Sequence, residues 1–505
     1  MSESFLAFDL GAESGRAILG RLHADVLDIR EIRRFPNEPI RRNGSLYWDI
    51  QRLWHELGIA LEHAAGTRPA SVGVDGWGVD YALIGERGNL LENPHHYRDL
   101  RNEGMMEAVL EQVSRDRIYA VTGIQFLQIN TLFQLYAACR LTPEIVAAAH
   151  ALVTIPDLLN YWLSGRLCSE YTIATTTQFI DAQARTWATS LLAEIGLPTT
   201  LLTEIVQPGT VVGGLRADVV PALGGTPVVA PACHDTGSAV ASVSAGGSTA
   251  FISSGTWSLL GTEMDAPVMT AKARDLNFTN EGGVCGTIRL LKNINGLWLL
   301  QSCRRSWAAD GHALEYGPLL SAAADDRLAF TSLIDPDHHA FLNPADMPAQ
   351  IAQYCRRTSQ PEPSGPPAFA RTILESLAMK YRVVLESLEE LTGRRFEQIR
   401  IVGGGSRNRL LNQFTADATG RAVLAGPVEA TALGNIGMQL LATGAVSTLA
   451  EARAVIDRSF PVERFEPVAT DRWDEQYRRF QQYLDGAGVG DDHRRTEGPG
   501  EPVRQ

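Results

Sequence analysis

Two stretches of the chain, one in each half, repeat the same order of apolar and small polar positions. In the first, an apolar run at 5–8 passes through small and charged residues into a second apolar run at 17–22. In the second, apolar residues at 249–252 pass through serine, glycine and threonine at 253–256 into an apolar run at 257–262. Short apolar runs joined by glycine-containing turns predict β-hairpins. Small turn residues let backbone N–H groups face a phosphate, so the repeat predicts two similar domains that close on a nucleotide.

The rest of the pattern alternates strands with helices. Short apolar runs predict strands at 70–74, 81–84, 227–230, 286–291 and 398–402. Longer amphipathic stretches predict helices at 51–65, 297–308, 368–391 and 408–420, and a mainly helical region at 101–165. Strands separated by helices indicate mixed α/β sheets.

Small residues at 242–248, just ahead of the second hairpin, predict a domain boundary. We therefore expect an N-terminal domain at 1–244 and a C-terminal domain at 245–485, with a cleft for the ligands between them. The segment 486–505 is polar and rich in glycine and charged residues, and this composition predicts a disordered tail.

Composition and charge narrow the class of partner. The 505 residues are 45% hydrophobic and 20% charged, as in globular proteins, and the formal net charge is −13. This acidic balance argues against nucleic acid and against an anionic membrane surface, because both need a basic face. The six cysteines lack metal-binding or redox spacing, the N-terminus lacks the basic flank of a signal peptide, and no apolar run could span a bilayer. We expect a cytoplasmic protein with small-molecule partners, either a monomer or a homodimer.

The first hairpin turn carries candidate phosphate and metal ligands. Asp9 ends the opening strand, where a carboxylate can hold Mg²⁺ beside phosphate groups, and a turn-stabilising aspartate is the alternative interpretation. Glu13 would repel a phosphate, so we expect its backbone to matter more than its side chain. Arg16 can either neutralise phosphate charge or lie on the strand edge as a surface cation.

Asp235 stands between the strand at 227–230 and a helix that begins near Thr236. One interpretation is a helix N-cap, a role worth about 1 kcal/mol. The other is a general base, because phosphoryl transfer to a sugar hydroxyl needs a carboxylate to accept the proton. Ligands of open α/β sheets bind at the carboxyl ends of the strands, and this position favours the base. The neighbouring His234 can bind a sugar hydroxyl or pack in the core.

Three further stretches place small or polar groups at strand ends. Trp77 and Gly78 form either a shallow wall that a sugar can approach or a core tryptophan with a turn glycine. Asn293 offers an amide to a sugar or to a phosphate, although an asparagine shortly before a glycine is more often part of a plain turn. The glycine triplet at 403–405 lets a nucleotide approach the backbone closely.

Taken in order along the chain, these motifs resemble those of the FGGY carbohydrate kinases, a family within the actin-like superfamily. The resemblance covers about residues 5–470. It rests on the segments 9–16, 74–80, 96–99, 125–131, 233–238, 254–258, 293–301 and 403–406.

The resemblance implies two actin-like domains of the ribonuclease H-like type, with nucleotide and sugar in the cleft between them. It implies an ATP-dependent, Mg²⁺-assisted kinase that phosphorylates a ketose, L-rhamnulose, at O1 to give L-rhamnulose 1-phosphate and ADP. Asp235 is implied as the proton acceptor. The residues implied to bind ATP are Ala12, Glu13, Ser14, Gly15, Arg16, Thr256, Gln301 and Gly404, and those implied to bind the ketose are Gly78, His234, Asp235, Thr236 and Asn293.

Three other functions are compatible with parts of this pattern. The nearest is a sister kinase that acts on L-fuculose or L-xylulose. An actin-like ATPase without sugar kinase activity needs no carboxylate aimed at a sugar hydroxyl, so Asp235 argues against it. A sugar-sensing regulator on the same fold usually carries a DNA-binding segment, and the sequence shows no basic helix-turn-helix pattern.

Overall fold

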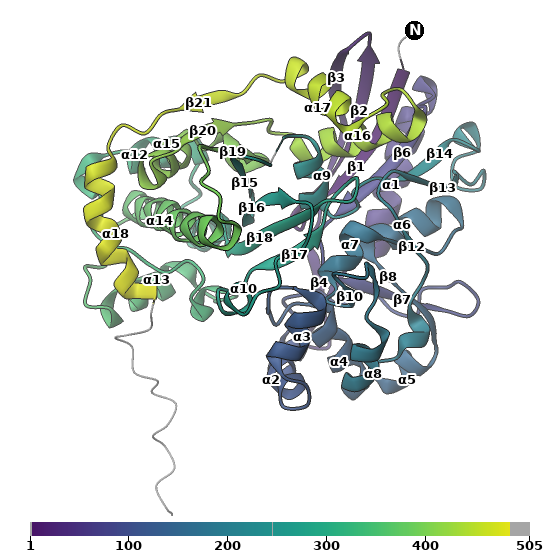
Figure 1. Cartoon of the computed structure of the whole chain (residues 1–505), viewed down its shortest axis with the longest axis horizontal. Helices are drawn as coiled ribbons and strands as arrows, with labels where there is room; N and C mark the ends of the chain where they lie inside the picture. The colour runs from purple at the N-terminus through teal and green to yellow at the C-terminus, as the bar shows by residue number, and fades with distance from the viewer. Residues whose placement is uncertain (1–2, 245, 485–505) are drawn as a thin grey trace, which may run out of the picture.

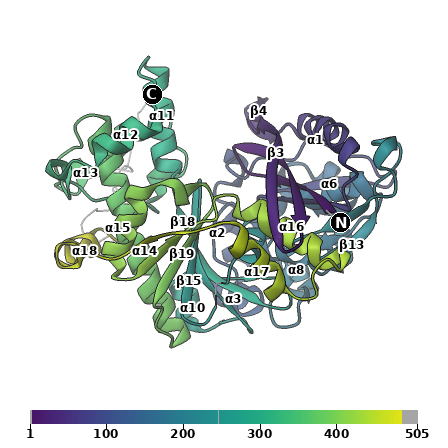
Figure 2. The same cartoon turned by 90° about the horizontal axis from the view of Figure 1, so that it is seen from above.

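The computed structural model describes residues 3–244 and 246–484, which form two α/β domains side by side (Figure 1, Figure 2). Each domain is built on a mixed sheet with helices packed against it. The predicted class of two α/β domains is therefore confirmed. The predicted tail at 486–505 and residue 245, which adjoins the predicted boundary, lie outside the described residues.

The N-terminal sheet has six strands in the order β13-β14-β6-β1-β2-β3. Their bounds are β1 (Glu3–Leu10), β2 (Ser14–His23), β3 (Val26–Pro36), β6 (Ser71–Gly76), β13 (Thr210–Gly214) and β14 (Pro227–Ala230). The first predicted hairpin is confirmed, since β1 pairs antiparallel with β2. Asp9 lies opposite Arg16 in that pair and opposite Asp75 in the parallel pair of β1 with β6.

The C-terminal sheet has seven strands in the order β17-β18-β16-β15-β19-β20-β21. Their bounds are β15 (Thr249–Ser254), β16 (Trp257–Met264), β17 (Thr279–Gly282), β18 (Ile288–Asn295), β19 (Gln398–Val402), β20 (Ala422–Ala425) and β21 (Glu463–Phe465). The antiparallel pair of β15 and β16 confirms the second predicted hairpin. The strand predicted at 286–291 is β18, which continues to Asn295, so Asn293 lies in a strand and the plain-turn interpretation is wrong.

Helices and short pairs of strands complete both domains. The helices of the N-terminal half are α1 (Ile50–Ala64), α2 (Met105–Leu110), α3 (Arg115–Thr122), α4 (Thr131–Leu141), α5 (Pro143–Ala147), α6 (Ile155–Ser164), α7 (Tyr171–Thr176), α8 (Thr189–Ile195) and α9 (Asp235–Ala241). Those of the C-terminal half are α10 (Ala271–Asp275), α11 (Trp298–Ala309), α12 (Tyr316–Ala323), α13 (Met347–Arg357), α14 (Pro366–Thr392), α15 (Arg409–Thr419), α16 (Ala430–Thr443), α17 (Leu449–Ser459) and α18 (Thr470–Leu484). Short two-stranded pairs are β4 (Pro39–Arg42) with β5 (Ser45–Trp48), β7 (Tyr81–Gly85) with β8 (Ala149–Thr154), β9 (Ser169–Glu170) with β12 (Ile205–Val206), and β10 (Ile180–Asp181) with β11 (Thr186–Trp187). None of the helices in the described part of the chain is long and apolar enough to cross a membrane.

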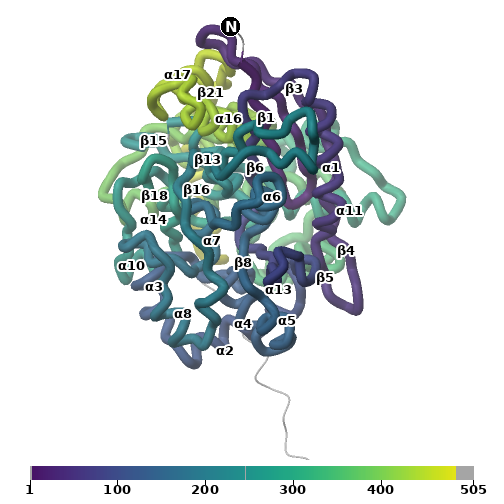
Figure 3. Tube along the Cα trace, turned by 90° about the vertical axis from the view of Figure 1, so that its right-hand side faces the viewer, coloured from purple at the N-terminus to yellow at the C-terminus, as the bar shows by residue number. Residues whose placement is uncertain are grey.

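Two helices from the last part of the chain pack on the N-terminal sheet. α16 contacts β1 and β6, and α17 contacts β3, so these yellow-green segments lie against the purple strands in every view (Figure 1, Figure 3). Leu433, Ile436 and Leu440 of α16 share one core with Phe5 and Ile18 of the first hairpin. One face of the first sheet is therefore covered by helices from the last part of the chain, whereas α1 and α6 of the N-terminal half also pack on this sheet.

α16 also crosses α9 at very close range. A Cβ atom on Gly434 would lie 1.7 Å from the backbone oxygen of Ser238, a distance that no side chain can adopt. Gly437 is in the same helix but has ordinary space, since its Cβ would lie 3.5 Å from Ile456 Cδ1. The helix crossing depends on glycine at the first position and not at the second.

These two glycines form a matched pair of tests. We expect Gly434→Ala to lower the thermal unfolding midpoint, because overpacking a tight contact typically costs about 1–3 kcal/mol. We expect Gly437→Ala to leave the midpoint unchanged or to raise it, because alanine is favoured over glycine inside a helix by about 0.5–1 kcal/mol. Thermal unfolding followed by circular dichroism measures both, and equal midpoints would contradict the tight crossing.

Candidate active site

A cavity of about 380 Å³ lies between the two domains and receives side chains from both. It brings together residues from both predicted hairpin turns, the glycine triplet and the start of α9. The predicted site residues that line it are Asp9, Ala12, Glu13, Ser14, Arg16, Gly78, His234, Asp235, Thr236, Thr256, Asn293, Gln301 and Gly404. The predicted phosphate-binding turns and the predicted general base thus face one space.

Gly15 is the predicted site residue that does not line this cavity. It is buried in β2, and a Cβ atom there would lie 2.2 Å from the ring of Phe35 on β3. The aromatic ring occupies the space that a side chain would need. Gly15 therefore shapes the first turn from behind.

The Arg16 guanidinium bonds to two carboxylates, Asp9 across the first hairpin and Glu429 beside α16. Glu429 is the N-cap residue of α16, so this ion pair links the first turn to the start of α16. The partners are mostly buried, and salt screens such pairs less than exposed ones. Arg16 therefore balances the charge of Asp9 at the cavity wall.

The turn that follows Asp9 is held by Asn37 and not by the Glu13 side chain. The Asn37 backbone N–H donates to the Glu13 backbone oxygen at 2.9 Å, and its side-chain amide donates to the Gly11 backbone oxygen at 2.9 Å. The Glu13 carboxylate lies 3.2 Å from Arg305 on α11. Both side chains of this ion pair are largely exposed, and such pairs contribute little stability, about 0–1 kcal/mol.

The second hairpin turn and the glycine triplet pack closely on each other. Gly403 has a φ of 82°, and a Cβ atom on Gly405 would lie 2.0 Å from Ser254 Oγ. Gly404 differs, because the position of its Cβ has no protein atom within 4 Å and faces the cavity. Gln301 lines the same cavity, and its buried Oε1 finds no hydrogen-bond donor among the described residues. This end of the cavity therefore offers free backbone surface and an unused acceptor.

Asp235 is the first residue of α9, and the N-cap position belongs to His234. Its Oδ1 accepts a hydrogen bond from the backbone N–H of Thr236 at 2.6 Å. Burial raises the pKa of Asp235 above its ordinary value; the charge of His234 opposes this shift and the charge of Asp9 adds to it. A raised pKa makes the carboxylate a better proton acceptor than an exposed aspartate.

A third carboxylate, Asp75, lies beside Asp9 in the register of β6 and β1 and is completely buried. Its Oδ2 accepts a hydrogen bond from the Asn435 side chain at 2.6 Å, whereas its Oδ1 has no donor among the described residues. Burial raises the pKa of Asp75 well above its ordinary value, and the charge of Asp9 adds to the rise.

Asp80 organises the wall beside Gly78. Its Oδ2 accepts hydrogen bonds from Trp48 Nε1 at 2.5 Å and Trp77 Nε1 at 3.0 Å, and its Oδ1 accepts one from Gln134 Nε2 at 2.9 Å. Burial raises the pKa of Asp80 to about 6, although these hydrogen bonds oppose the shift. Trp77 is thus a buried, anchored tryptophan that lines the cavity with Gly78.

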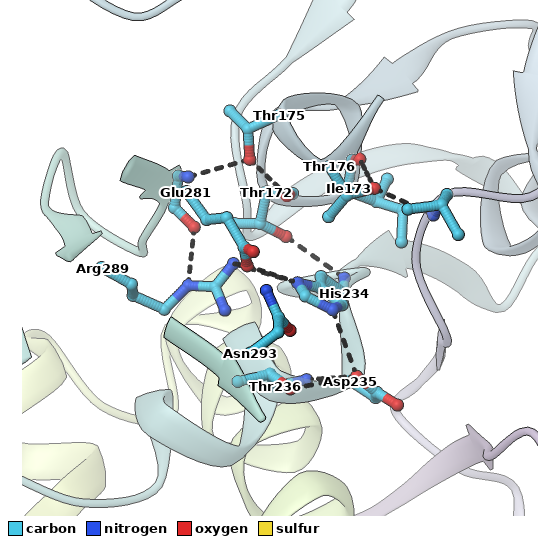
Figure 4. Close-up of polar contacts among 12 residues, drawn as sticks. Thr172, Ile173, Thr175, Thr176, His234, Asp235, Thr236, Glu281, Arg289 and Asn293 are labelled. Carbon is cyan, nitrogen blue, oxygen red and sulfur yellow. Dashed lines mark hydrogen bonds and ion pairs between the residues drawn. The ribbon is translucent and has the colours of Figure 1, made fainter. Parts of the chain in front are cut away.

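Three residues outside the predicted set of site residues hold the predicted ones in place. Gln125 Oε1 accepts hydrogen bonds from the backbone and side-chain N–H groups of Asn293, at 2.9 and 3.0 Å. Glu281 and Arg289 lie opposite each other on β17 and β18 and contact His234 (Figure 4). Gln125 carried a signal, since it begins the motif at 125–131. No sequence signal pointed to Glu281 and Arg289, because charged residues in strands mostly face solvent.

The fold is shared with solved two-domain kinases. A xylulose kinase from Lactobacillus acidophilus matches with a TM-score of 0.77 at 15% identity, covering 96% of this chain and 97% of that one. A glycerol kinase from Plasmodium falciparum, solved with ADP, matches with a TM-score of 0.76 at 15% identity, covering 97% and 98%. The architecture is therefore the two-domain α/β fold of these kinases.

Sequence comparison identifies the family. The N-terminal domain model of the FGGY family of carbohydrate kinases matches residues 4–241, and its C-terminal domain model matches residues 250–443. The rhamnulokinase of Bacteroides thetaiotaomicron is 46% identical over 485 residues, which cover 95% of this chain and 99% of that protein. The rhamnulokinase of Oceanobacillus iheyensis is 39% identical over 474 residues, which cover 93% and 100%. The chain belongs to the FGGY family of carbohydrate kinases, and it is a phosphotransferase that acts on a carbohydrate.

The free space in front of Gly404 leads to a prediction for the nucleotide. Gly404→Val should fold normally, because a Cβ atom there has no non-neighbouring atom of the described residues within 4 Å, but its side chain should occupy part of the cavity. We expect the KM for ATP to rise much more than the KM for the sugar in steady-state assays that vary each substrate in turn. An unchanged KM for ATP in a variant with the wild-type unfolding midpoint would remove Gly404 from the nucleotide site.

Proposed function

We propose that the protein transfers the γ-phosphoryl group of ATP to O1 of L-rhamnulose, giving L-rhamnulose 1-phosphate and ADP. The sugar assignment is carried by the 46% identity to the Bacteroides thetaiotaomicron rhamnulokinase over 95% of this chain. Phosphoryl transfer is supported by the cavity, because turns from both domains face the same space as Asp235.

In this proposal ATP binds to the two hairpin turns and the glycine triplet. Backbone N–H groups in such turns suit phosphate oxygens, and glycine lets the nucleotide come close. Gly15 contributes through the shape that it gives the first turn, since it does not line the cavity. The assigned ATP-binding residues are Ala12, Glu13, Ser14, Gly15, Arg16, Thr256, Gln301 and Gly404.

The ketose binds beside Gly78, His234, Thr236 and Asn293, with its O1 hydroxyl turned to Asp235. As O1 attacks the γ-phosphorus, Asp235 accepts the O1 proton, and the bond between the γ-phosphorus and the bridging oxygen breaks. The electron pair of that bond leaves with ADP. The raised pKa of Asp235 suits the role of proton acceptor.

We assign Mg²⁺ to Asp9. The residues present fit this ion, because Asp9 and Asp235 line one cavity and Mg²⁺ needs only one or two carboxylates when phosphates and waters complete its ligands. A full protein cage of three or more His, Cys, Asp or Glu side chains does not occur within the described residues. Bound with ATP, the ion would neutralise phosphate charge.

We also infer a domain boundary at 244/245, a cytoplasmic location, and a monomer or homodimer. The boundary is supported by the family models, which leave residues 242–249 between their matched segments. The acidic net charge of −13 is consistent with small-molecule partners and with the absence of a nucleic-acid or membrane partner.

A sugar panel tests the proposed reaction. L-Rhamnulose, L-fuculose and L-xylulose are compared in a coupled ADP-release assay, and NMR locates the phosphate on each product. We expect the highest kcat/KM for L-rhamnulose, with phosphate on O1. A higher value for another ketose would reassign the substrate, and ADP release that is independent of sugar would indicate an ATPase.

A second test concerns the proton acceptor. Asp235→Asn keeps the shape of the side chain and removes the base, so we expect kcat to fall roughly 10²–10⁴-fold while both substrates still bind. Isothermal titration calorimetry with sugar and with ATP checks binding. A folded variant that phosphorylates sugar near the wild-type rate would leave Asp235 with a structural role at the start of α9.

A further inference from the structure

A buried ion pair stands behind the proposed sugar site. Glu281 on β17 and Arg289 on β18 lie opposite each other, and Arg289 Nη2 is 3.2 Å from Glu281 Oε2. Arg289 is fully buried, and Glu281 is 4% exposed and lines the cavity. Replacing a buried ion pair by apolar residues is often neutral or stabilising, so stability alone is a weak reason for such a pair.

The pair keeps Glu281 charged in a place where burial opposes charge. Burial alone would raise the pKa of Glu281, but the charges of Arg289 and His234 lower it below its ordinary value. Arg289 Nε donates to the backbone oxygen of Gly282 at 2.9 Å, which fixes the guanidinium. Glu281 is therefore an ionised acceptor in a fixed position.

His234 is held on its ring and on its backbone. Its Nδ1 is 3.2 Å from Glu281 Oε2 and 3.1 Å from Arg289 Nη2, and its Nε2 is 3.4 Å from Asp235 Oδ1. Its backbone N–H donates to Thr172 Oγ1 at 3.2 Å. With the backbone fixed, the contacts at Nδ1 decide where Nε2 points and whether Nδ1 carries a proton.

Nδ1 can donate to Glu281 or accept from Arg289, but it cannot do both at once. A carboxylate is the stronger partner, since hydrogen bonds to an ionised acceptor are shorter and roughly twice as strong as neutral ones. Arg289 still has Glu281 and the Gly282 oxygen as partners when Nδ1 carries a proton. The arrangement with Nδ1–H donating to Glu281 therefore gives the carboxylate a donor and leaves Arg289 its contacts at Nη2 and Nε, whereas Arg289 Nη1 has no partner among the described residues.

We propose that Glu281 is a positioning residue that accepts the Nδ1–H of His234 and thereby directs Nε2 at Asp235 and the sugar, with Arg289 keeping Glu281 ionised. The inference rests on the proposed sugar kinase function and deepens it. The pair belongs to the C-terminal sheet, whereas His234 and Asp235 stand where the N-terminal half ends. The orientation of the proposed base thus depends on contact between the two domains.

The first experiment compares two Glu–Arg pairs whose glutamates lie in the same sheet, and the arginine of the second pair comes from α17. Glu263 on β16 is 9% exposed and accepts from Arg453 at 2.8 and 2.9 Å, but it does not line the cavity. We expect Glu281→Gln to lower kcat/KM for the sugar roughly 10–100-fold, as with orienting partners of metal-bound histidines, and to leave the KM for ATP unchanged. Glu263→Gln should alter stability alone. Equal kinetics of the two variants would assign the Glu281–Arg289 pair a structural role only.

The second experiment asks whether Glu281 acts through His234. Glu281→Gln is measured alone and combined with His234→Ala, and the two effects on sugar kcat/KM are compared in a double-mutant cycle. We expect Glu281→Gln to cause little further loss once His234 is alanine. The same fold loss in both backgrounds would overturn the proposal and indicate direct contact of Glu281 with the sugar.

The tests depend neither on the sugar assignment nor on the folding of a single variant. The assays use whichever panel sugar gives the highest wild-type kcat/KM, so a wrong sugar assignment does not affect the cycle. Should Glu281→Gln fail to fold, Glu281→Asp keeps the charge, shortens the side chain and carries the same cycle. For Glu281→Asp we expect a smaller loss than for a neutral variant, and again no further loss beside His234→Ala.

Discussion

The crossing of α16 over α9 is the contact on which the arrangement of the site depends. Gly434 approaches the Ser238 carbonyl so closely that no side chain fits between the helices. α9 begins at Asp235, and α16 begins after Glu429, which bonds Arg16 of the first turn. One helix crossing therefore fixes the proposed base relative to the proposed phosphate site. The same helix packs on the N-terminal sheet, so it contributes both to the site and to the core of that sheet.

The walls of the cleft hold buried carboxyl groups, and each is satisfied in a different way. Asp80 accepts hydrogen bonds from two indoles and a side-chain amide. Glu281 forms an ion pair with Arg289, and Asp75 accepts one hydrogen bond from a side-chain amide. Burying a charge is costly unless it is paired and hydrogen-bonded. Of the three, Asp75 has the fewest donors, and burial raises its pKa well above its ordinary value.

Local patterns predicted the local structure well. Both hairpins formed where short apolar runs flank turns rich in small residues, because strand and turn preferences act over a few residues. Asn293 shows the limit of such patterns. An asparagine near a glycine favours a turn, yet β16 pairs with β18 through Asn293 to Asn295 and so extends the strand past this residue. The ladder of hydrogen bonds outweighed the local preference.

The sequence by itself determined the α/β class, the two hairpins, the glycine triplet and the set of small and polar residues that gather in the cavity. The class, the hairpins and the glycine triplet depend on short-range periodicity and on the residue types at strand ends, whereas the set of site residues follows from the resemblance to the FGGY carbohydrate kinases. The tertiary structure alone decided that α16 completes the N-terminal sheet, that Phe35 places Gly15 behind its turn, and that Glu281 with Arg289 meets His234. Some of these contacts join segments that are distant in the sequence. The others depend on how neighbouring strands pack. Their geometry is fixed by close packing of whole elements, which no local pattern of residues encodes.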